Sequence, residues 1–96
     1  MNYLDRADDV YEEIRDEAWL SQHVEVVKLP RYNQNLRLEK VAYKGGNVYR
    51  VYSYNTLVAT GLEGGALMQS QWYSTTTQKH VNYVARELNM ELIKLF

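Results

Sequence analysis

The residues best suited to chemistry lie together between Trp72 and His80, in the run Trp-Tyr-Ser-Thr-Thr-Thr-Gln-Lys-His. Serine and threonine hydroxyls accept hydrogen bonds from the free N–H groups of a helix's first turn, so the run predicts that a helix begins here. Lys79 and His80 then lie within that first turn, where the helix dipole favours anions. The pattern indicates a capped helix start or an anion site, and both alternatives stay open.

Nucleophilic catalysis is a third interpretation, with Ser74, Thr75 or Thr77 as nucleophile and His80 as base. That chemistry also needs an orienting acid and an oxyanion hole. The sequence has no Gly-x-Ser-x-Gly elbow and no glycine-rich phosphate loop. We therefore predict a protein that is not an enzyme, in which the hydroxyls cap the helix. His80 is then a histidine at the edge of the core, hydrogen-bonded to backbone or to a tyrosine.

Composition excludes several kinds of site. The chain has 96 residues, no cysteine and only two histidines, His23 and His80. Without thiolates, and with two histidines far apart, we predict no disulfide, no metal site and no cofactor. No apolar run approaches the roughly 20 residues that cross a bilayer, and the N-terminus is acidic where a signal peptide is basic. We expect one soluble cytoplasmic domain, residues 1–96, that does not bind membranes.

Charge is unevenly distributed, because residues 1–20 hold seven acids and two arginines in a chain whose net charge is −1. Apolar residues from Tyr3 to Ala18 recur at the spacing of an amphipathic helix. The acidic face opposite them consists of Asp5, Asp8, Asp9, Glu12, Glu13 and Asp16. It is either a solvated exterior, or a surface that contacts a basic partner or partially imitates a nucleic-acid backbone.

The sequence after residue 20 predicts short strands and a second helix. The runs that favour strands are residues 23–29, 36–44, 47–54, 57–60 and 66–73. Gly45-Gly46 predicts a two-residue hairpin in which both glycines take positive φ, and Asn55-Thr56 predicts a further turn. The second helix is expected over residues 76–88, with Thr75 and Gln78 spaced as a capping box. Asn89 is a plausible helix stop, and residues 91–96 are either a strand or a packed tail.

These elements predict an α+β domain, in which an N-terminal amphipathic helix and a C-terminal helix cover one face of an antiparallel sheet of four or five short strands. Each helix has a single apolar stripe, so one buried face per helix is expected. The predicted core residues are Val10, Ile14, Val51, Val81, Val84 and Leu88.

Two motifs carry a family resemblance. Val51-Tyr-Ser-Tyr-Asn-Thr-Leu-Val-Ala59 fits the pattern YSYxTxVA, and Trp72-Tyr-Ser-Thr-Thr-Thr-Gln-Lys-His-Val-Asn82 fits YSxTTxKHxN. Over about residues 47–84 the chain resembles a small uncharacterised family of phage, archaeal and archaeal-virus proteins. Asn55 departs from the glycine expected in the turn of the first motif. The resemblance implies a viral or virus-associated origin, and so a host-cell cytoplasm, with no established activity.

Two classes of function remain open. The first is a non-enzymatic protein-interaction module that binds and modulates a host or viral protein, favoured by the resemblance, the acidic face and nine tyrosines. The second is a domain that binds single-stranded nucleic acid or RNA by stacking bases on rings beside cations. Its candidate surface, which would also serve another anion, is Arg50, Tyr52, Tyr54, Tyr73, Thr76, Lys79 and His80, with Trp72 among further aromatic and basic residues. Because a short domain gains by covering its strand edges, we also hypothesise a homodimer.

Overall fold

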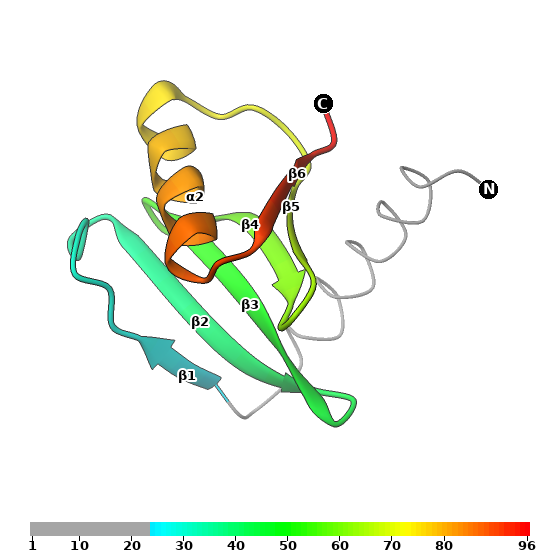
Figure 1. The fold of residues 1–96 in the computed structure, drawn as a ribbon. Coiled ribbons are helices and arrows are strands. Elements are labelled where there is room, and N and C mark those ends of the chain that lie inside the picture. Colours follow the sequence, from blue (N-terminus) through cyan, green and yellow to red (C-terminus); the bar gives the residue numbers. More distant parts are fainter. Residues whose placement is uncertain (1–23) are drawn as a thin grey trace.

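The computed structural model describes residues 24–96, so the predicted N-terminal helix, its acidic face and His23 lie outside the described residues. The described part forms one six-stranded sheet and one helix, α2 (Figure 1). The elements are β1 (Val24–Val27), β2 (Leu36–Tyr43), β3 (Gly46–Ser53), β4 (Thr56–Leu62), β5 (Ala66–Gln69), α2 (Thr75–Glu87) and β6 (Glu91–Lys94). All six strands lie in the sheet in the order of the sequence.

The predicted fold class is wrong. The first five strands pair antiparallel, but β6 pairs parallel to β5, so the sheet is mixed and has six strands. Parallel neighbours need a long crossover connection, and α2 supplies it. The described part is therefore mostly β with a single helix. The run from Glu91 to Lys94, which the sequence left open, is the sixth strand; four residues are too few for periodicity to separate a strand from a tail.

Both hairpin turns lie one residue earlier than predicted. Lys44 and Gly45 have φ of 46° and 80°, while Gly46 already pairs with Tyr43. In the next hairpin, Tyr54 and Asn55 have φ of 52° and 67°. Buried partners across the strands fix the register, and the turn then takes whichever residues remain between them. Two-residue turns with positive φ match the twist of the strands, so lysine and tyrosine are held in left-handed conformations.

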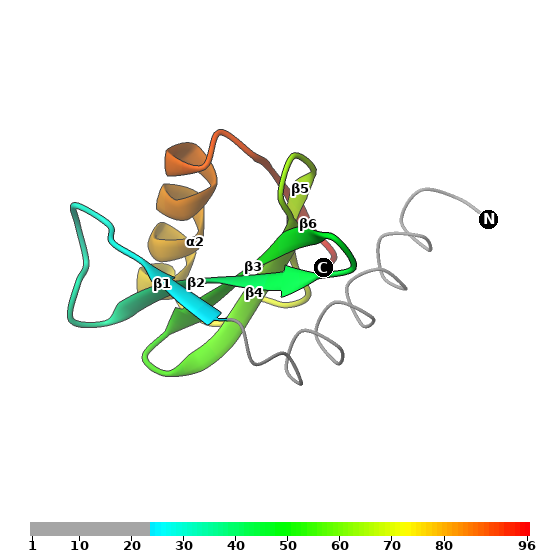
Figure 2. The same ribbon diagram turned by 90° about the horizontal axis from the view of Figure 1, so that it is seen from below.

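Helix α2 covers one face of the twisted sheet, as Figure 2 shows. Val51, Val81 and Val84 have no exposed surface, which confirms their predicted place in the core. Leu88 is only half-buried because it is the residue that ends α2. Val10 and Ile14 lie outside the described residues.

The ends of α2 explain how it joins the sheet. Ser74 is the N-cap, since its Oγ accepts the N–H of Thr77 at 3.1 Å. The predicted capping box from Thr75 to Gln78 is wrong, because the side chain of Gln78 turns toward the sheet instead. At the other end Asn89 has φ of 53°, and the N–H of Met90 bonds to the carbonyl of Ala85 at 2.8 Å. This is a Schellman stop, so Asn89 is confirmed as the helix stop that turns the chain into β6.

Candidate functional site

A group of neutral polar side chains is buried between β3 and α2, and we call Ser53, Thr77 and His80 the inner polar cluster. Ser53 Oγ lies 2.9 Å from Thr77 Oγ1 and 2.8 Å from His80 Nδ1. The three residues are 2%, 5% and 2% exposed. The cluster joins the end of β3 to the first two turns of α2, so the two sequence motifs meet at one point in space.

An amide pair extends this polar layer toward β5. The side chains of Gln69 and Gln78 exchange two hydrogen bonds, of 2.8 Å and 3.0 Å. Gln78 Nε2 also donates to Asn82 Oδ1 at 3.0 Å. Gln69 is fully buried and Gln78 is 9% exposed. Reciprocal amide bonds of this kind satisfy both groups away from water and fix the rotation of α2 on the sheet.

Burial lowers the pKa of His80, so its ring is neutral at neutral pH. Its Nδ1 faces Ser53, not the backbone or a tyrosine, which corrects the predicted partner. Its Nε2 has no hydrogen-bond partner among residues 24–96, and the residue borders a hollow of about 270 Å³ that is lined also by Tyr32, Asn33, Gln34 and Asn35. No carboxylate contacts the ring within the described chain, so the orienting acid that catalysis requires is missing there.

Two tyrosines flank His80. The ring centroids of Tyr32 and Tyr54 lie 4.8 Å and 5.7 Å from that of His80. Both tyrosines are well exposed, at 40% and 53%, and both have positive φ, of 62° and 52°. Positive φ is unfavourable for a bulky side chain and concentrates at functional sites. Backbone hydrogen bonds hold the conformation, from Leu36 N–H to the Tyr32 carbonyl and from Tyr54 N–H to the Asn35 carbonyl, each 2.9 Å.

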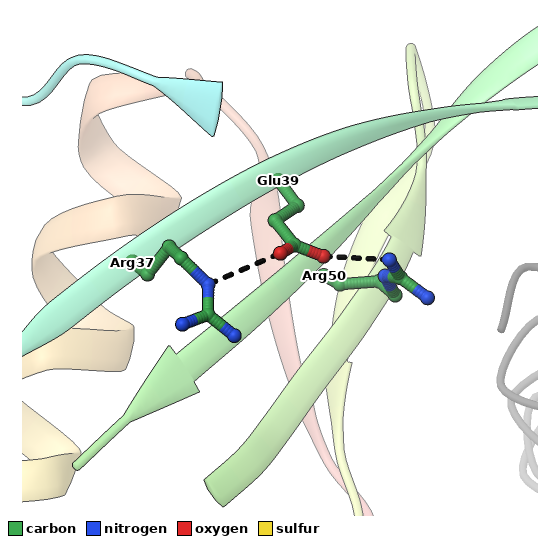
Figure 3. Close-up of polar contacts among 3 residues, drawn as sticks. All are labelled: Arg37, Glu39 and Arg50. Atoms are coloured by element: carbon green, nitrogen blue, oxygen red, sulfur yellow. Dashed lines mark hydrogen bonds and ion pairs between the residues drawn. The ribbon is translucent and has the colours of Figure 1, made fainter. Parts of the chain in front are cut away.

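The opposite face of the sheet carries charges, and we call Arg37, Glu39 and Arg50 the outer charged cluster (Figure 3). Glu39 accepts from Arg37 Nε at 3.1 Å and from an Arg50 terminal nitrogen at 2.6 Å. The Arg37 guanidinium also lies 4.3 Å from the centre of the Tyr52 ring. Arg50 and Tyr52 are each 5% exposed, and burial is the main reason that the pKa of Tyr52 is raised.

The structure therefore divides the predicted nucleic-acid or anion surface. Tyr54, Thr76 and Lys79 are exposed on the side of α2, where His80 lies beneath them. Tyr73 is half-buried, and its hydroxyl donates to the Leu57 carbonyl at 3.5 Å. Arg50 and Tyr52 belong to the other face and cannot share a ligand with Lys79.

Sequence reasoning missed the part of the site that follows Pro30. Residues 30–35, Pro-Arg-Tyr-Asn-Gln-Asn, lie between two predicted strands and carry no predicted site, yet Tyr32 packs on His80 and Tyr83. Tyr32 also borders a groove with Lys79, Asn82 and Arg86. Three consecutive amide side chains beside a tyrosine were the signal that could have marked this loop.

Comparisons with known proteins give a family and no activity. No helix among residues 24–96 has the length and apolar character to span a membrane, and that range holds no group of three or more potential metal ligands. The comparisons with curated proteins and with solved structures found no match. A family model matches residues 24–92, which include both sequence motifs and the inner polar cluster. Because that match spans most of the chain, the protein belongs to DUF8033, a family of unknown function.

Proposed function

We propose that this domain binds single-stranded nucleic acid on a surface at the N-terminal end of α2. The observation that carries the proposal is a set of three exposed aromatic rings around α2: Tyr32, Tyr54 and Trp72 are 40%, 53% and 54% exposed. Tyr32 and Tyr54 flank His80, and Trp72 stands two residues before the cap Ser74. Exposed rings of this size favour stacked bases, at about 1–3 kcal/mol for each base. We call Tyr32, Tyr54, Trp72, Thr76 and Lys79 the helix-end surface.

Charge around the helix-end surface favours an anionic ligand. The first turn of α2 has no acidic residue, and its N–H groups carry the positive end of the helix dipole. The groove between Tyr32 and α2 is bordered by Lys79 and Arg86, and no carboxylate of residues 24–96 borders it. Residues 24–96 contain nine lysines and arginines against five glutamates. Phosphates passing Lys79 would therefore meet a positive potential.

The protein-interaction module is the second candidate. Its acidic face lies outside the described residues and stays a prediction. The observation that favours it is β1, a strand at the edge of the described sheet with Val24 and Val26 43% and 60% exposed. Such an edge suits strand addition by a peptide or by a second copy. Under this second candidate we also propose that the protein is of viral origin, that its partner is a host factor, and that it forms a homodimer.

The first experiment measures binding of fluorescently labelled ten-nucleotide DNA and RNA single strands by anisotropy at several salt concentrations. We expect affinity to fall steeply with salt, because each neutralised phosphate releases counterions. Tyr54→Asn removes a ring yet suits the left-handed turn, so we expect a loss of about 5-fold to 100-fold, the value of one stacked base. Lys79→Ala should weaken binding to every sequence and reduce the salt slope by about 1.

The matched control is Lys44→Ala. Lys44 is exposed in the turn at the other end of β3 from Tyr54, about 25 Å away at the rise of a strand. Absence of binding at low salt, or an equal loss from Lys44→Ala and Lys79→Ala, would reject the proposal. Reversing Asp9, Glu12 and Asp16 to lysine tests the second candidate, since it should release a protein partner that survives nuclease treatment.

A further inference from the structure

The hollow beside His80 combines features that a plain structural contact does not need. His80 is 98% buried, but its Nε2 has no hydrogen-bond partner within residues 24–96. Asn33, Gln34 and Asn35 border the same hollow, and their side-chain amides bond to no described residue. A volume of about 270 Å³ falls below the range of drug-sized pockets, so it suits one small planar ring.

The hydrogen bonds of the inner polar cluster decide which role Nε2 plays. If Thr77 donates to Ser53 and Ser53 donates to Nδ1, every buried hydroxyl proton in the chain of bonds has an acceptor. The reverse direction leaves the Thr77 proton without one, which is unfavourable in a buried site. The neutral ring then carries its proton on Nε2. Because Nδ1 bonds to Ser53 and His80 borders the hollow, we assign the Nε2–H as the donor that faces the hollow.

We infer that the hollow receives the edge of one unstacked base, and that it selects bases that carry a carbonyl oxygen. The Nε2–H of His80 donates to that oxygen, while the amides of Asn33 and Asn35 bond to neighbouring positions on the base edge. Tyr32 borders the hollow beside the His80 ring, so its own ring packs against the base. Thymine, uracil, cytosine and guanine offer a carbonyl and adenine does not. The inference rests on the proposed function and adds to it the residues that set base preference.

The test compares binding of ten-nucleotide thymidine and deoxyadenosine homopolymers. One good hydrogen-bonded contact discriminates by about 1–3 kcal/mol, so we expect the thymidine strand to bind at least about 5-fold tighter. The double variant Asn33→Ala/Asn35→Ala should bring this ratio toward 1. Lys79→Ala should weaken both strands equally and leave the ratio unchanged. The control is Gln71→Ala, which removes an exposed amide that does not border the hollow.

A second readout uses the folded wild-type protein and needs no substitution. In nitrogen-15 NMR spectra of the imidazole, the Nε2 resonance of His80 should shift on adding the thymidine strand and should stay in place with the adenosine strand at equal occupancy. If both strands bind equally well, or if Nε2 does not respond, the base-edge inference is overturned while nucleic-acid binding stands. If neither strand binds at low salt, the proposed function and this inference both fail.

Discussion

Beneath α2 the buried polar atoms are neutral and connect elements that are distant in sequence, whereas on the opposite face they are charged and connect neighbouring strands. Ser53 reaches Thr77 and His80 across 24 and 27 positions. Glu39, by contrast, reaches Arg37 on its own strand and Arg50 on the next one. The inner polar cluster therefore attaches the helix to the sheet, and the outer charged cluster reinforces the β2–β3 ladder.

This difference shows that two clusters of buried polar groups of similar size can depend on different kinds of partner. A neutral chain of hydrogen bonds tolerates burial once each donor and acceptor is satisfied. A buried guanidinium needs a countercharge, because desolvation is costly. Removing one residue of the inner polar cluster should thus loosen the attachment of α2 to the sheet. Removing one residue of the outer charged cluster should leave a charge with too little compensation.

The largest effect is expected from His80→Ala. Removing a fully buried ring leaves a cavity and takes one partner from Ser53, so we expect the free energy of unfolding to fall by about 3 kcal/mol in urea denaturation. His80→Asn is the matched variant, since its amide reaches the position of Nδ1 and should recover part of the loss. A loss below about 1 kcal/mol for His80→Ala would show that the inner polar cluster does not hold α2.

On the outer face, Glu39→Gln should lower the free energy of unfolding by about 2–3 kcal/mol, because it removes the carboxylate from a 5%-exposed arginine. Arg37→Ala is the control. The Arg37 side chain is 41% exposed, so its ion pair should contribute less than about 1 kcal/mol. Equal losses from the two variants would mean that burial does not distinguish the two ion pairs of the outer charged cluster.

A smaller effect is expected at the start of α2. Ser74→Ala removes the cap that accepts the Thr77 N–H and should destabilise the protein by about 1 kcal/mol. Thr75→Ala, one residue later and exposed, should change stability by less than about 0.5 kcal/mol. If the two losses come out in the reverse order, Thr75 is the cap and the assignment of Ser74 fails. Thermal unfolding followed by circular dichroism separates the two variants.

The smallest effect is expected from the protonation of His80. Because burial lowers the pKa of His80, the unfolded chain takes up a proton near the ordinary histidine value of 6.5 before the folded chain does. The stability that His80 contributes is therefore complete above that pH and is lost as the pH falls toward the folded pKa. Urea midpoints measured from pH 7.5 to 5.5 should decrease more steeply for the wild type than for His80→Asn. Parallel curves would contradict a buried neutral ring.

Sequence alone determined the local features of this protein. Helix α2 was predicted within one residue at each end, because a cluster of hydroxyls, a 3.6-residue apolar stripe and Asn89 are all local signals. Two hairpins were predicted at nearly the right places for the same reason.

Tertiary structure decided what those local features do. The sixth strand and its parallel pairing depend on β5 being free beside Glu91–Lys94, which no local pattern reveals. Gln78 was assigned to a cap, but it bonds Gln69 because a buried amide needs a partner more than an exposed helix end does. Likewise, the contact between His80 and Ser53 joins residues 27 positions apart and exists only because β3 and α2 pack together. Contacts between distant residues arise from packing, so the candidate site became visible only in the folded chain.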